Sequence, residues 1–163
     1  MAVARVQTRV RVRVQDGPFD LAAELAALTA GRRDVGGGGS FIGIVRDEHQ
    51  GRTITALTLE HYPAMTERAL ADIAAQAQAR WPLLGCTLIH RVGTLRPGEP
   101  IVLVLTASAH RGAALEACAF LIDWLKTSAP FWKQESYDDG STAWVAARGE
   151  DEAAAARWAL PPG

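Results

Sequence analysis

The chain opens with a strict alternation of apolar and charged residues over positions 6–14. Valines occupy one face of this stretch and arginines the other: Val10, Val12 and Val14 against Arg9, Arg11 and Arg13. A period of two residues is typical of a half-buried β-strand. Arginine-rich starts also occur in targeting or nucleic-acid-binding arms, but the strict alternation favours a strand with one solvated face.

Helical and strand-like patterns then follow one another along the chain. Segments 20–30, 63–81, 111–127 and 150–160 are predicted to be helices from their apolar spacing and from start and stop signals such as Asp20, Pro63 and Pro82. Segments 40–46, 53–61, 86–92, 101–109, 132–136 and 143–147 have the short apolar or alternating runs of strands.

Two pairs of these strands are predicted to form hairpins. Segments 40–46 and 53–61 flank a polar turn, and segments 132–136 and 143–147 flank Asp138-Asp139-Gly140, which resembles a type I′ turn. Four glycines at 36–39 come before a strand, whereas a phosphate-binding loop of the GxxxxGK[ST] kind comes before a helix. We therefore predict a flexible connector at 36–39.

The order of these elements predicts the fold class. Helices and strands are mixed without regular βαβ alternation, which favours an α+β fold with a mixed or antiparallel sheet. A chain of 163 residues, 48% of them hydrophobic, is long enough to bury a core. We expect a single domain over 1–163, with a flexible Pro-Pro-Gly tail.

Charge and composition exclude some classes of function. The formal net charge is −1, so no general basic field attracts nucleic acid or an anionic membrane surface. The longest apolar stretches are far shorter than the roughly 20 residues of a membrane helix, and the N-terminus lacks the apolar region of a secretory signal. We expect a cytoplasmic protein in which Cys86 and Cys118 are buried, reduced thiols, with a disulfide or a reactive thiol as the alternative.

The helix predicted at 111–127 carries the candidate chemistry. Lys126 lies at its C-terminal end and Lys133 follows seven residues later, beyond Pro130, which prevents the helix from continuing. Either lysine alone would be read as a solvated side chain. If they lie close together near other cations, like charges disfavour the protonated amine and lower its pKa, so that a lysine can exchange protons near neutral pH.

A basic pair, His110-Arg111, stands where this helix begins. Helix N-termini favour anions, and the guanidinium group of Arg111 suits a phosphate or a carboxylate. Because a cation is electrostatically disfavoured at this end of a helix, the pair indicates either an anion site or an ordinary solvated helix start.

The other histidines give weaker signals. His61 has no second histidine at a metal-ligand spacing, so we expect no metal, and nothing in the chain calls for a cofactor. His49 is interpreted as a loop residue. His90-Arg91 is interpreted as part of a strand with one polar face, with an accessory anion contact as the alternative.

Four segments carry a family resemblance: Val45-Arg46-Asp47, LTLEHYPAMTE at 57–67, the His110-Arg111 pair and KTSAPFWKQE at 126–135. Together they resemble the catalytic (large) subunit of molybdopterin synthase, over about 40–148. The resemblance implies an α/β hammerhead-type core with a small antiparallel β subdomain.

The resemblance also implies an activity and partners. In this family, sulfur passes from the C-terminal Gly-Gly thiocarboxylate of a small ubiquitin-like subunit to cyclic pyranopterin monophosphate, twice, to form the dithiolene of molybdopterin. The large subunit is expected to be the homodimeric core of a heterotetramer. Both reactants are anionic, which suits a local basic pocket in a nearly neutral chain.

The family motif assigns roles to particular residues. Lys126 and Lys133 are expected to be catalytic, and Arg148 is expected to reach the pocket from the other copy of the homodimer. Where the family often has basic residues, this chain has Ile44 and Gln134, so contacts there are limited to the main chain, for which Ile44 and Val45 are candidates. The full set expected to bind substrate is Arg46, His110, Arg111, Gln134, Glu135, Ile44, Val45 and Arg148.

A function of another class fits the same residues. A non-catalytic module could bind a ubiquitin-like tail or an anionic metabolite in the basic pocket without turnover. Nucleic-acid binding is disfavoured by the net charge and by the lack of aromatic residues interleaved with the basic ones.

Overall fold

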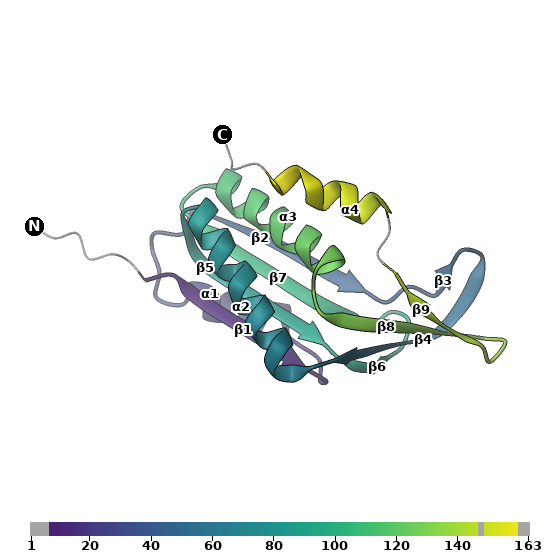
Figure 1. Ribbon diagram of the computed structural model, residues 1–163. Coiled ribbons are helices and arrows are strands. Elements are labelled where there is room, and N and C mark those ends of the chain that lie inside the picture. The colour runs from purple at the N-terminus through teal and green to yellow at the C-terminus, as the bar shows by residue number, and fades with distance from the viewer. Residues whose placement is uncertain (1–6, 147–148, 160–163) are drawn as a thin grey trace, which may run out of the picture.

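The computed structural model describes residues 7–146 and 149–159, and its first sheet has four strands in the order β1-β5-β7-β2 (Figure 1). These are β1 (Arg9–Gln15), β5 (Leu83–Arg91), β7 (Pro100–Ser108) and β2 (Gly37–Ile44). β1 pairs with β5 in parallel, and the other two pairs are antiparallel. The N-terminal alternation therefore forms a strand, as its pattern predicts, and this strand lies at one edge of the sheet.

Helices cover both faces of this sheet. α2 (Pro63–Arg80) and α3 (Arg111–Thr127) lie across one face, over the larger apolar core, and α1 (Leu21–Thr29) lies behind the other face over a smaller one (Figure 1). The predicted helix start at Asp20 is confirmed, since its carboxylate accepts the Ala23 N–H at 3.0 Å. Among the described residues, no helix is both long and apolar enough to cross a membrane.

A second, antiparallel sheet extends from one end of the first (Figure 1). It contains β3 (Glu48–His49), β4 (Arg52–His61), β8 (Phe131–Tyr137) and β9 (Thr142–Val145), with β6 (Gly93–Leu95) also paired to β4. One mixed sheet covered by helices and one small antiparallel sheet confirm the predicted α+β fold.

The C-terminal segment returns to the helical layer. α4 (Gly149–Ala156) lies along α3 and ends in a short 3-10 helix, η1 (Arg157–Ala159) (Figure 1). The Trp158 ring packs edge-on against Trp81 and Phe120, with 5.6 Å between ring centroids in each pair. Its indole N–H donates to the carboxylate of Asp123 on α3 at 2.7 Å. These contacts fasten α4 beside the C-terminal half of α3.

The first predicted hairpin is wrong. β2 pairs with β7 and β4 pairs with β8, so the loop after Ile44 carries the chain from the first sheet to the second. The main chain of Val45 marks this exit, because its N–H donates to the Glu99 carbonyl at 3.0 Å and its carbonyl accepts the Gly98 N–H at 2.8 Å. Neighbouring apolar runs predict strands, but they do not determine which strands pair.

The prediction of a flexible connector at 36–39 is also wrong. Gly37, Gly38 and Gly39 are part of β2, and they allow α3 to pack closely on the sheet. A Cβ at Gly37 would lie 3.0 Å from the Arg111 Cα, and a Cβ at Gly39 would lie 2.7 Å from the Ala114 carbonyl oxygen. Glycine is needed here for close approach and not for flexibility.

The second predicted hairpin is confirmed, but its turn type is not. β8 and β9 pair across Asp138-Asp139-Gly140, with the Gly140 N–H donating to the Tyr137 carbonyl at 3.0 Å. A type I′ turn needs positive φ at both central residues, and here only Gly140 has one, at 82°. The loop is thus a type I turn followed by a left-handed glycine.

Candidate active site

The end of α3 and the start of β8 bring the two lysines together. Leu125 is buried in the core, which leaves Lys126 exposed at the end of the helix, and Pro130 then redirects the chain into β8. Lys133 follows Phe131 by two residues and so lies on the same face of β8. Both lysines line one cavity of about 420 Å³. They are the only lysines of the chain, which also has 15 arginines.

Other elements complete the walls of this cavity. Arg46 enters just after β2, and Asp151 enters from α4. Apolar side chains form much of the remaining surface, among them Phe41, Ile54, Leu57, Ile101, Leu125 and Phe131. The result is a partly apolar cavity with three cationic groups and at least two carboxylates, those of Glu135 and Asp151.

The surroundings of Lys133 change its acidity. Burial first, and the charge of Lys126 second, lower the pKa of this lysine to about 8, with the carboxylate of Asp151 acting in the opposite direction. An amine with a pKa near 8 exchanges its proton easily at neutral pH. This matches the lysine pair expected from the sequence.

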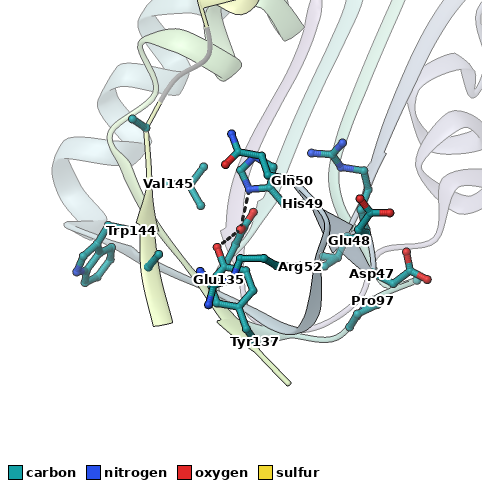
Figure 2. A pocket seen from close by; sticks show the side chains of 15 residues that line it. Asp47, Glu48, His49, Gln50, Arg52, Pro97, Glu135, Tyr137, Trp144 and Val145 are labelled. Atoms are coloured by element: carbon teal, nitrogen blue, oxygen red, sulfur yellow. Dashed lines mark hydrogen bonds and ion pairs between the residues drawn. The ribbon is translucent and has the colours of Figure 1, made fainter. Parts of the chain in front are cut away.

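A second, more open pocket of about 1290 Å³ shares a wall with the lysine cavity. Six residues line both: Val45, Arg46, His49, Glu135, Val145 and Ala146. Figure 2 shows His49 and Tyr137 converging on Glu135 within it, whereas Trp144 points away.

The carboxylate of Glu135 is buried in this wall, with 6% of the residue exposed. Its Oε2 contacts His49 Nδ1 at 2.8 Å and accepts the Tyr137 hydroxyl at 2.7 Å (Figure 2). The guanidinium group of Arg52 lies 3.6 Å from the centre of the Tyr137 ring. With these partners, Glu135 is held as part of the wall instead of reaching freely into the lysine cavity.

The structure does not bring His110 and Arg111 to this cavity within one chain. His110 caps the N-terminus of α3 and Arg111 begins it, so Lys126 lies 15 residues further on, about 22 Å along the helix axis. Both residues are exposed and neither lines the cavity. The sequence grouped them with the lysines by chemistry, but α3 separates them.

Of the other residues expected to contact substrate, some line the cavity and some do not. Ile44 lines the cavity with 56% of its surface exposed, and Val45 lines it too, although both of its main-chain polar groups are bonded within the chain. Gln134 faces the opposite side of β8 from Lys133 and does not line the cavity. Arg148 lies outside the described residues.

Comparison with known proteins shows the family to which the chain belongs. The family model described as MoaE protein matches residues 14–128. The chain belongs to the MoaE family.

Its relatives in this family match along nearly the whole chain. A molybdopterin synthase catalytic subunit from Mesorhizobium japonicum is 59% identical over 148 residues, covering 90% of this chain and 92% of the relative. Another from Ralstonia nicotianae is 54% identical over 149 residues, covering 91% of this chain and 84% of the relative. A solved structure, molybdopterin cofactor biosynthesis protein E from Burkholderia multivorans, has a TM-score of 0.78 at 48% identity, covering 94% of this chain and 99% of that one.

Some polar residues of this MoaE-family site were not singled out from the sequence. The sequence places Asp151 only within the helix predicted at 150–160, and His49 only in a loop. In the structure both line the cavity, and His49 also contacts Glu135. The row Phe131, Lys133, Glu135 and Tyr137, with its period of two, was the available signal for the shared face of β8.

Two expectations about side chains outside the cavity had opposite outcomes. Cys86 and Cys118 are free and buried as expected, and burial raises their pKa values to about 12 and about 11.

His90 and Arg91 do not form the polar face that we predicted, because both are buried, with 3% and 7% exposed. Their polar atoms are bonded within the fold: Arg91 Nε donates to the Asp16 carbonyl at 3.2 Å.

Proposed function

We propose that this chain is the catalytic subunit of a molybdopterin synthase. It transfers sulfur from the C-terminal thiocarboxylate of a small ubiquitin-like partner to cyclic pyranopterin monophosphate, forming the molybdopterin dithiolene in two transfers. The observation that carries the proposal is the pairing of the chain's only two lysines in one cavity beside Arg46. The names of its close relatives support it.

The cationic side chains and the apolar walls of the cavity have different tasks in this reaction. Lys126, exposed at the rim, and Arg46 offset the negative charge of the thiocarboxylate and of the cyclic phosphate. Lys133, with its pKa near 8, moves protons as sulfur replaces oxygen on the substrate. The apolar walls limit water around these groups and so strengthen their electrostatic effect.

The distance along α3 supports a proposal for the quaternary structure. We propose a homodimer, at the core of a heterotetramer with two small subunits, in which His110, Arg111 and Arg148 of one copy complete the cavity of the other. The cavity of a single chain holds both lysines but lacks His110 and Arg111. We place the reaction in the cytoplasm, where the two buried thiols would stay reduced.

A reconstituted assay tests this function. The purified chain, the thiocarboxylated partner and the cyclic pterin are combined, and the dithiolene product is measured. Lys126→Ala and Lys133→Ala are each expected to lower turnover by about 100-fold or more with the fold unchanged by circular dichroism. Arg33→Ala, which removes an exposed cation remote from the cavity, is the matched control and should keep its activity.

Two results would contradict parts of the proposal. A near-normal rate in either lysine variant would remove that lysine from the mechanism. Tight binding of the partner by calorimetry, with no dithiolene formed by the wild-type chain, would favour the non-catalytic binding module instead.

A further inference from the structure

His90 is a buried polar residue that the proposed mechanism does not use. It lies near the end of β5, only 3% exposed, on the same face as the core residues Cys86 and Leu88. A polar ring costs free energy in such a place unless its hydrogen bonds are satisfied and its position serves some purpose.

One hydrogen bond fixes the state of this ring. Nδ1 lies 2.8 Å from the Arg91 carbonyl oxygen, and since a carbonyl only accepts, Nδ1 carries the proton and Nε2 does not. Burial first, and then the charge of Lys133, lower the pKa of His90 to about 3; Lys126 and His61 act in the same direction, and the hydrogen bond to Arg91 acts against them. The imidazole is therefore neutral at physiological pH.

The ring also makes a close aromatic contact. It stacks on Phe131 with 3.9 Å between centroids and 23° between the planes. Phe131 is the first residue of β8, lines the lysine cavity and precedes Lys133 by two residues on the same face of the strand. The stack thus fixes the start of β8 at the wall of the cavity.

We propose that His90 is a positioning residue for Lys133. Held by the Arg91 carbonyl, its ring clamps Phe131 and sets where the Lys133 side chain enters the cavity beside Lys126. The catalytic importance of this placement rests on the proposed function, but the placement itself does not.

Two substitutions separate the two halves of this role. His90→Phe keeps an aromatic ring for the stack but loses the donor to Arg91. His90→Asn keeps a donor at the position of Nδ1 but loses the stack. Leu88→Val, a mild core change two residues earlier on the same face, is the matched control for general loosening of β5.

The test measures the pKa of Lys133 in the full chain. With only two lysines present, reductive methylation with ¹³C-formaldehyde labels Lys126, Lys133 and the N-terminus, and Lys126→Arg assigns the signals. The same spectra record Lys126, whereas Asp151 and His61, the other titratable groups that act on Lys133 and His90, carry no label.

We expect His90→Asn to let Lys133 move toward solvent and its pKa rise by about one unit from the wild-type value. Turnover should fall about tenfold with KM unchanged, because positioning affects the chemical step. His90→Phe should stay closer to the wild type in both the Lys133 pKa and the turnover. Leu88→Val should match the wild type in both. If His90→Asn does not fold, Phe131→Leu removes the other half of the stack and should raise the same pKa.

Three outcomes would overturn the inference: an unchanged Lys133 pKa in His90→Asn, an equal rise in Leu88→Val, or a rise in His90→Phe as large as in His90→Asn. The titration needs no sulfur transfer. A wild-type chain that makes no dithiolene would therefore remove the proposed function while leaving this comparison intact.

Discussion

At the residue scale, the site depends on lysine as distinct from arginine. Arginine stays protonated throughout the working pH range, so the 15 arginines of this chain hold charge without exchanging protons. Lys133 differs because burial and Lys126 destabilise its charged form. The sequence predicted a pair of like charges, and so the direction of the pKa shift. It could not predict burial as the larger cause, because that depends on side chains from β2, β4 and α3.

Lys133→Met tests the electrostatic cost of this lysine. Its folded-state pKa of about 8 lies below the ordinary value of 10.5, so the unfolded chain binds more protons between these pH values and wild-type stability rises with pH across that window. Methionine binds no proton there. The increase in the free energy of unfolding caused by Lys133→Met should therefore be about 1–3 kcal/mol larger at pH 7 than at pH 10.5. Urea unfolding at both pH values measures this; an equal effect at both would mean that the pKa is not lowered.

At the element scale, local patterns predicted helices well and sheet pairing poorly. The apolar period of 111–127 and the cap at Asp20 are properties of consecutive residues, so they could be read directly. The pairing of β2 with β7, and the need for glycine in β2, depend on elements that lie more than 50 residues away in the chain. No pattern within 36–46 contains that information.

Two neighbouring glycines of β2 allow a matched test of close packing. A Cβ at Gly39 would lie 2.7 Å from both the Ala114 carbonyl oxygen and the Thr106 hydroxyl, so Gly39→Ala should destabilise the fold by about 1–3 kcal/mol. At Gly38 the nearest atom would be 3.5 Å away, so Gly38→Ala should change stability by less than about 0.5 kcal/mol. Denaturant unfolding compares the two. Equal effects would show that α3 does not press on this strand.

At the scale of the whole molecule, α3 separates groups that the proposed reaction would bring together. The sequence could identify His110, Arg111 and both lysines as one chemical set. It could not show that they lie at opposite ends of a 17-residue helix. A two-fold dimer resolves the conflict when each site takes one end of α3 from each copy.

Mixed dimers test this arrangement. Refolding Lys133→Ala together with Arg111→Ala should restore about a quarter of wild-type activity, because half of the dimers are mixed and one of their two sites has no substitution. Mixing Lys126→Ala with Lys133→Ala is the control and should restore nothing, since both lysines come from the same copy. No recovery in the first mixture would place Arg111 in the same copy as the lysines.

The two cysteines lead to a last consequence. Both thiols are buried, burial keeps them protonated, and neither lines the lysine cavity. A relay through a protein persulfide needs an accessible thiolate, and these side chains do not offer one. In the proposed reaction sulfur then passes from carrier to pterin directly, and an alkylating reagent such as iodoacetamide should leave the catalyst intact.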